Sequence, residues 1–190
     1  YENRSLQLVY LSSAENLAQL EVLRKDHLKS IGYETGTPES GKEFSVVWLS
    51  YNVHGNESTS TEAALKTLHT LVTEKQAWLE KLVVIMDPCI NPDGRDRYVN
   101  WYNQVKSTPF DIDPKANEHY EDWPGGRYNH YYHDLNRDWA WLSQVESQQR
   151  LPQYLSPITG ARVPGSAAGT WRQDADQAAT RHRESRQVAR

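Results

Sequence analysis

A histidine and a glutamate three residues apart, His54 and Glu57, could together hold a metal ion. They lie in the segment SYNVHGNE, residues 50–57, where one turn of backbone can direct both side chains at the same ion. Zinc takes imidazole nitrogen and carboxylate oxygen at about 2.0–2.2 Å, and a catalytic zinc keeps one position for water. The spacing alone is not specific, because His119 and Asp122 repeat it. The alternative is a helix-capping carboxylate beside a surface histidine.

The position of this pair in the chain favours a metal site. An apolar segment, FSVVWL at 44–49, precedes it and is predicted to be a buried strand. A helix is predicted over 58–82, and a further buried strand over 83–86, VVIM. Ligands of α/β folds gather beyond the carboxyl ends of strands, which is where His54 and Glu57 lie. Gly55 between them is expected to permit an unusual backbone.

Residues 91–94, NPDG, follow the strand predicted over 83–86. Asn-Pro and Asp-Gly are turn-forming pairs, so the chain is predicted to reverse here, beside the first site.

A third segment, DLNRDW at 134–139, places the amide of Asn136 next to the guanidinium of Arg137. Arginine pairs bidentately with a carboxylate, and asparagine can add a donor. The segment is therefore a candidate carboxylate-binding site. The alternative is a surface ion pair between Arg137 and Asp134 or Asp138.

Alternating strands and helices predict the fold class. Residues 5–12 are predicted to form a strand and residues 13–32 a helix, ahead of the elements described above. We therefore expect an α/β fold with a mainly parallel or mixed sheet flanked by helices.

Composition excludes several classes of protein. The chain has 190 residues, of which 37% are hydrophobic and 24% charged, as in one ordinary domain or part of a larger one. No apolar run approaches the roughly 20 residues that cross a bilayer. A net charge of -4 argues against binding to nucleic acid or an anionic membrane. Because Cys89 is the single cysteine, any metal must be held by histidine and carboxylate.

The end of the chain differs from the rest. Residues 156–190 contain six arginines, no lysine and three large aliphatic residues, Ile158, Val163 and Val188. Such a segment cannot form much core, so we expect residues 1–155 to be the domain and residues 156–190 a disordered or foreign tail. A polar helix beginning near Asp174 is the alternative.

In their order along the chain, HGNE, NPDG and DLNR resemble the zinc metallocarboxypeptidases of the carboxypeptidase A type, over roughly residues 1–155. The resemblance implies a carboxypeptidase-like fold, here incomplete at the carboxyl end, and zinc as cofactor. It implies that His54 and Glu57 bind the zinc. It also implies that Asn136 and Arg137 bind the free carboxyl terminus of a peptide or protein substrate.

Some members of this family have an arginine upstream of DLNR that stabilises the oxyanion formed during hydrolysis. Arg127 fits that position best, and Arg95, Arg97 and Lys106 are its competitors. A positive charge placed there in advance is worth on the order of 3 kcal/mol.

Two parts of the family site have no convincing counterpart, namely a third zinc ligand, a histidine on a later strand, and a glutamate general base. His182 lies between Arg181 and Arg183, whose charges oppose binding of a dication. His130 and His133 are interpreted as exposed loop histidines. We therefore expect a truncated carboxypeptidase site that is weak or inactive.

Two other functions remain open. One is a related zinc amidohydrolase or deacylase. The other is a metal-free module that binds peptide or glycan ends through Arg137 and the loop 98–141, which holds 11 of the 20 aromatic residues. The family resemblance favours an extracellular or periplasmic location, although the amino end carries no hydrophobic signal segment.

Overall fold

The computed structural model describes residues 1–155 of the chain. The predicted tail, the alternative helix from Asp174 and the candidate ligand His182 lie outside the described residues.

A small mixed sheet forms the centre of the fold. Its strands are β1 (Val9–Leu11), β2 (Ser45–Ser50) and β3 (Leu82–Asp87), in the order β1-β3-β2. β2 runs parallel to β3 with Val47 opposite Val84, whereas β1 runs antiparallel to β3. The predicted α/β fold with a mixed sheet is confirmed, although the strand expected over 5–12 is only three residues long.

The helices alternate with the strands as expected. They are α1 (Ala14–Ala18), α2 (Leu20–Ser30), α3 (Ser60–Thr73), α4 (Pro92–Val105), α5 (Val145–Leu155) and three short 3-10 helices, η1 (Gln76–Glu80), η2 (Asn117–His119) and η3 (Leu135–Arg137). The predicted helix over 13–32 is broken at Gln19 into α1 and α2. None of the helices within residues 1–155 has the length and apolarity needed to cross a bilayer.

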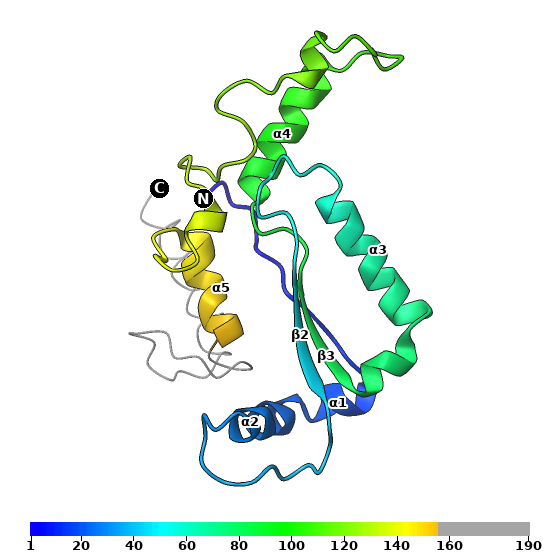
Figure 1. Ribbon diagram of the computed structural model, residues 1–190, viewed down its shortest axis with the longest axis vertical. Coiled ribbons are helices and arrows are strands. Elements are labelled where there is room, and N and C mark those ends of the chain that lie inside the picture. The colour runs from blue at the N-terminus through cyan, green and yellow to red at the C-terminus, as the bar shows by residue number, and fades with distance from the viewer. Residues whose placement is uncertain (156–190) are drawn as a thin grey trace, which may run out of the picture.

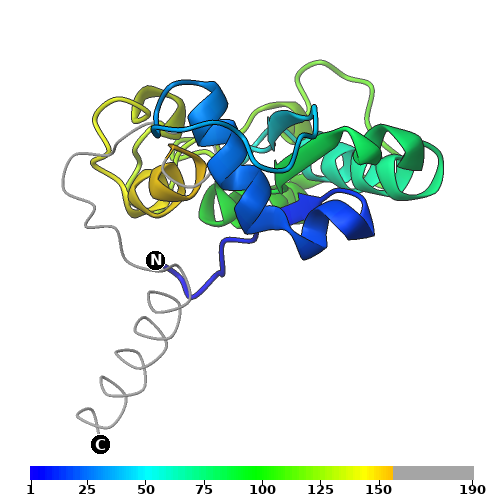
Figure 2. The same cartoon turned by 90° about the horizontal axis from the view of Figure 1, so that it is seen from below.

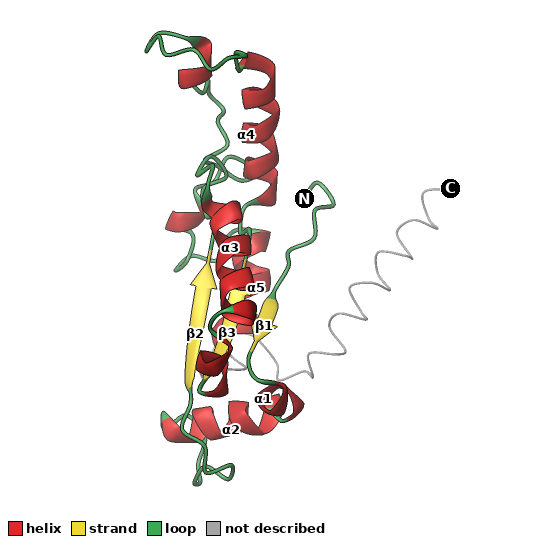
Figure 3. Cartoon of the chain, turned by 90° about the vertical axis from the view of Figure 1, so that its right-hand side faces the viewer, coloured by secondary structure: helices red, strands yellow, loops and turns green. Residues whose placement is uncertain are grey.

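The two faces of the sheet are packed differently. On one face, Ala64 and Leu71 of α3 pack against Val84 and Met86 of β3. Figure 1 shows α3 and α5 on opposite sides of β2 and β3. Seen from below, α2 lies across the end of the sheet where β2 begins (Figure 2). Figure 3 shows α4 extending beyond the carboxyl ends of β2 and β3. The segments that follow these two strands meet there, since the backbone N–H groups of Ile90 and Asn91 donate to the carbonyls of Tyr51 and Asn52.

The prediction of a reverse turn at residues 91–94 was wrong, because these residues begin α4. The Asn91 side chain accepts a hydrogen bond from the backbone N–H of Gly94 at 2.9 Å, and Pro92 is the first helical residue. Asparagine is favourable at the N-cap because its side chain accepts a hydrogen bond from an N–H group that the helix leaves unpaired. Proline is favourable at the first helical position because it has no N–H group to leave unpaired.

A buried ion pair joins α5 to the carboxyl end of β3. Arg150 forms an ion pair with Asp87, and both side chains are almost completely buried. The same guanidinium donates to the backbone carbonyls of Ile90 at 2.7 Å and Cys89 at 3.0 Å. α5 therefore fixes the segment that connects β3 to α4, next to the predicted site.

We predict that Arg150→Ala lowers the free energy of unfolding by about 3–5 kcal/mol, because it leaves the Asp87 carboxylate buried without its guanidinium. Urea denaturation measures this change. Arg24→Ala, which removes the ion pair with the more exposed Glu21, is the control and should cost less than about 1 kcal/mol. Equal small losses in both variants would contradict the stabilising role of α5.

Candidate functional site

The loop that carries His54 and Glu57 is held by the buried side chain of Asn52. Its Nδ2 donates to the backbone carbonyls of His54 at 3.1 Å and Glu57 at 3.2 Å. Its Oδ1 accepts from the Cys89 thiol at 3.3 Å. Asn52 itself has φ 57°, a left-handed conformation that asparagine adopts more readily than most residues. One side chain thus fixes the backbone of both predicted metal ligands.

Gly55, between those ligands, is required by close packing and not by an unusual φ. A Cβ there would overlap the backbone of Gly94 and Arg95, at the start of α4, and the carbonyl of Gly126. A Cβ on Gly94 would overlap the backbone carbonyl of Gly126, and a Cβ on Gly126 would overlap that of Gly94. Its φ is not positive, so the unusual backbone expected at Gly55 is not a left-handed one.

The His54 ring lies between two carboxylates. Its Nδ1 is 3.0 Å from Glu57 Oε1, and its Nε2 is 3.0 Å from Asp134 Oδ1. His54 is buried, with 7% of its surface exposed, whereas Glu57 is exposed. The structure therefore brings HGNE and DLNR, 80 residues apart between His54 and Asp134, into direct contact.

Asp134 fixes the proton on His54. Burial raises the pKa of Asp134, but hydrogen bonds from His54, Arg127 and the backbone N–H of Asn136 outweigh it and hold the pKa below its ordinary value. An ionised carboxylate only accepts hydrogen bonds, so His54 Nε2 carries a proton and donates it. Nδ1 lies equally close to the Glu57 carboxylate, so without a metal ion it can donate a hydrogen bond there. In the tautomer that has its proton on Nε2 alone, Nδ1 is the nitrogen that can bind an ion.

Of the four basic residues considered for the oxyanion role, Arg127 lies at this site. Its Nη2 donates to Asp134 Oδ2 at 2.8 Å. Arg95 instead pairs with Glu62, and Arg97 donates to backbone carbonyls of residues 125, 128 and 129. Lys106 is exposed at the end of α4.

Asn136 and Arg137 are both exposed, in η3. Asn136 Oδ1 accepts from Trp139 Nε1 at 3.3 Å, which leaves the Nδ2 group as the donor. Arg137 forms no side-chain ion pair with any residue in the range 1–155. Arg137 does not form the alternative surface ion pair with Asp134 or Asp138. Asp134 binds His54 and Arg127 instead. Asp138 binds Ser143 and Gln144.

Comparison with protein-family models shows to which family the chain belongs. The family model described as zinc carboxypeptidase (Peptidase_M14) matches residues 1–165 of the chain. The chain belongs to the zinc carboxypeptidase family. Comparisons with curated proteins and with solved structures gave no match.

As a family member, the chain has residues that fit zinc. Two tetrahedral ligands at about 2.1 Å from zinc lie about 3.4 Å apart, so His54 Nδ1 and Glu57 Oε1, at 3.0 Å, need to separate by only a few tenths of an ångström. Asp134 on the other ring nitrogen is the arrangement that orients a zinc-binding histidine. The donor chemistry and the protonation of His54 both suit the ion.

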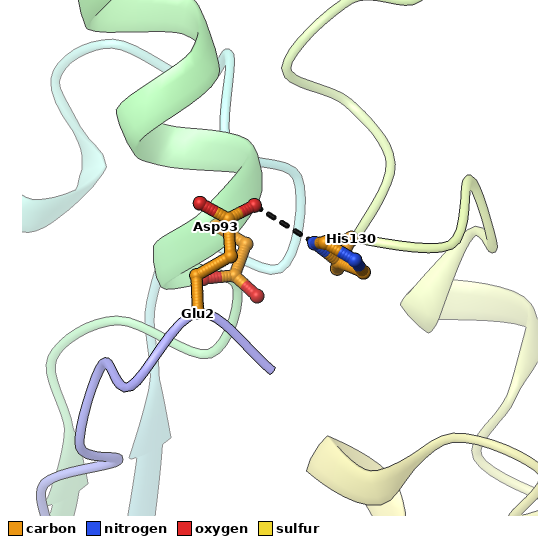
Figure 4. Close-up of side chains that lie close together, drawn as sticks. All are labelled: Glu2, Asp93 and His130. Carbon is orange, nitrogen blue, oxygen red and sulfur yellow. Dashed lines mark hydrogen bonds and ion pairs between the residues drawn. The ribbon is translucent and has the colours of Figure 1, made fainter.

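A third zinc ligand does not lie beside this pair within residues 1–155. In that range, one group of three potential ligands comes together elsewhere, namely Glu2, Asp93 and His130. Figure 4 shows them, with the 2.8 Å contact between Glu2 and His130 dashed. Arg4 already pairs with Glu2 and Asp93, at 2.7 Å each, and its hydrogen bond lowers the pKa of Glu2 to about 2. The positive charge of Arg4 opposes a dication there.

The remaining histidines of the loop do not lie at the site. His119 Nε2 bonds the backbone carbonyl of Asp111 at 2.8 Å, so its spacing to Asp122 is coincidental. His133 is exposed and His130 partly so, in line with their interpretation as loop histidines.

Sequence reasoning missed the parts played by Asn52 and Asp134. The sequence suggests Asp134, directly before Leu-Asn-Arg, only as a partner for Arg137. Asn52 carried one signal, an asparagine in the turn that follows β2, since asparagine tolerates the left-handed conformation of turns. The contacts of Asp134 with His54 and of Asn52 with Cys89 join residues far apart in the sequence, so they required the fold.

We predict that Asp134→Asn lowers zinc affinity about 10–100-fold, because it removes the charged acceptor that orients the His54 ring. Isothermal titration with zinc measures the change. Asp138→Asn is the matched control, since Asp138 lies in the same segment but binds Ser143 and Gln144. Equal loss in both variants would contradict a specific role for Asp134.

We also predict that Asn52→Gly weakens zinc binding about tenfold, because the His54–Glu57 loop loses its shared donor. Glycine accepts φ 57° without strain, so the substitution removes only the amide. Asn16→Ala is the control: Asn16 is equally buried and donates to the carbonyls of Leu79 and Glu80, far from the site. Both variants should lose about 1–3 kcal/mol of stability. Unchanged zinc affinity in Asn52→Gly would refute the role of this side chain.

Proposed function

We propose that this protein is a zinc-dependent carboxypeptidase that removes carboxyl-terminal residues from peptides and proteins, and that the 190-residue chain does so weakly. One observation carries the proposal. His54 lies between Glu57 and Asp134, and the same Asp134 carboxylate holds Arg127. Residues from three separate segments are thereby joined through the His54 ring.

His54 and Glu57 would hold the ion, His54 through Nδ1 and Glu57 through its carboxylate. When bound, zinc supplies a Lewis acid that polarises the scissile carbonyl and lowers the pKa of a water molecule toward 7. Asp134 keeps the proton of His54 on Nε2, and thus keeps Nδ1 available as a ligand.

Arg127 would stabilise the negative oxygen that develops on the scissile carbonyl. Asp134 engages its Nε and Nη2 atoms, so the guanidinium is fixed in orientation before substrate binds. About 39% of its side chain is exposed, which leaves it accessible to a ligand. A charge that needs no reorganisation during the reaction is worth on the order of 3 kcal/mol.

Arg137 and Asn136 would bind the terminal carboxylate of the substrate. The Arg137 guanidinium is exposed, and within residues 1–155 no carboxylate competes for it. A bidentate pair with a substrate carboxylate, supplemented by Asn136 Nδ2, would select free chain termini over internal peptide bonds.

Weak activity is proposed because two ligands hold zinc less firmly than three. Among residues 1–155, no group of three potential ligands includes His54 and Glu57. Hydrolysis by this chain would therefore rely on Arg127 and substrate positioning.

The proposal is tested by zinc retention and hydrolysis. After dialysis we expect less than one zinc per chain, and none in His54→Ala, because the buried nitrogen ligand is lost. N-acetyl dipeptides with a free carboxylate should be hydrolysed slowly, and their amidated forms not at all.

His69→Ala serves as the control, since His69 is exposed on α3 and contacts Thr73. It should retain zinc as the unmodified chain does. One tightly held zinc per chain with fast hydrolysis would overturn the weak-site proposal, and cleavage of amidated peptides would overturn the carboxypeptidase assignment.

A further inference from the structure

Two consecutive loop segments, residues 121–128 and 129–133, are held rigidly by buried polar contacts. Asn129 is completely buried, and its Oδ1 accepts from the backbone N–H groups of Tyr131 at 3.1 Å and His133 at 2.9 Å. Its Nδ2 donates to Gln144 at 2.9 Å. From α4, Arg97 donates to the carbonyls of residues 125, 128 and 129 at 3.2 Å each. The backbone of both segments is thus fixed.

This rigid backbone presents aromatic rings to solvent. Trp123 is 69% exposed and Tyr132 is 49% exposed, yet their ring centroids are 5.7 Å apart. Tyr128 meets Trp123 edge-on at 5.0 Å, and the Arg97 guanidinium lies 5.1 Å from the centre of the Tyr132 ring. We call Trp123, Tyr128 and Tyr132 the aromatic platform.

Tyr132 has a backbone conformation that costs energy. Its φ is 64°, in the left-handed region, which is unusual for a bulky residue and costs of order 1–3 kcal/mol. The conformation places a half-exposed ring beside Trp123 instead of burying it in the core. Such local strain is found most often at ligand sites, where it presets a geometry.

The aromatic platform is attached directly to the candidate metal site. Glu121 accepts from Asn56 Nδ2 at 2.8 Å and also bonds the backbone N–H of Gly126. The Gly126 carbonyl packs against Gly55. Arg127, between Trp123 and Tyr132 in the chain, is fixed by Asp134. These contacts join the loop that carries the platform to the loop that carries His54 and Glu57.

We propose that the aromatic platform is a substrate subsite for a large apolar or aromatic side chain on the residue that supplies the scissile carbonyl. This inference rests on the proposed function, in which Arg127 binds the oxygen of that carbonyl. The side chain of the same residue lies next to that carbonyl, and the platform residues stand before and after Arg127 in the chain. Flat rings offer apolar area at little entropic cost.

A peptide side chain fits the platform better than a sugar does. Sugar binding needs hydrogen-bonding groups around the rings. The Arg97 donors already bind carbonyls, and the Glu121 carboxylate is engaged by Asn56 and Gly126. Apart from the hydroxyls of Tyr128 and Tyr132, the platform therefore offers mainly ring faces.

The test compares N-acetyl-Phe-Leu with N-acetyl-Ala-Leu by isothermal titration in the presence of zinc. We expect the unmodified chain to bind the phenylalanine peptide about tenfold more tightly. Trp123→Ala should abolish this preference while leaving the affinity for the alanine peptide unchanged. Tyr132→Gly, which removes the ring but accepts φ 64°, should reduce the preference without unfolding the turn.

Trp141→Ala is the matched control, because Trp141 is 82% exposed and has no ring contact with the platform. It should keep the full preference. If the unmodified chain bound both peptides equally and Arg137→Ala bound neither, the subsite would be overturned and the proposed function would stand. Failure of both peptides to bind would overturn the proposed function as well. Binding of chitotriose that Trp123→Ala abolishes would overturn the assignment to a peptide side chain.

Discussion

The contact between the His54 ring and Asp134 is the interaction on which the site depends. An imidazole has two nitrogens on opposite sides of the ring, so a carboxylate on Nε2 decides where Nδ1 points. Here Nδ1 points at Glu57, and the second oxygen of Asp134 binds Arg127. A single carboxylate thus sets the direction of one predicted zinc ligand and the orientation of the predicted oxyanion-binding residue.

Close backbone packing makes that contact possible. Gly55, Gly94 and Gly126 come from the loop after β2, the start of α4 and the loop before Arg127, and side chains on them would overlap the neighbouring backbone. The three segments can approach because none of these residues has a Cβ. The buried pair of Arg150 and Asp87 fixes the β3 end of the same region. The site is consequently built where the strands end, as the parallel pairing of β2 and β3 requires.

Polar side chains, and not apolar packing, organise the loops around the site. Asn52 holds the backbone of His54 and Glu57, and Asn129 holds the turn that presents Tyr132. Asp138 receives hydrogen bonds from Ser143 and Gln144, which hold its pKa below the ordinary value against the effect of burial. Each of these groups is satisfied by backbone or side-chain donors, so its burial is compatible with stability. Loops held in this way can present exposed functional groups in fixed positions.

The sequence by itself determined the α/β class, the strands ending near Leu49 and Met86, and the family, because hydrophobic periodicity and short motifs are local properties of the chain. It predicted that His54 and Glu57 share one turn, which the structure agrees with, while their role as zinc ligands stays a prediction. Only the tertiary structure decided that Asp134 binds His54, that NPDG begins a helix, and that Gly55 is needed for close packing. The first and third of these features depend on contacts between segments far apart in the chain, and such contacts leave no periodicity in the sequence. The start of α4 rests on a local capping bond from Gly94 to Asn91, in a segment whose residue pairs also favour turns. The sequence therefore predicts most of the strands and helices, whereas the long-range contacts between side chains are known only from the tertiary structure.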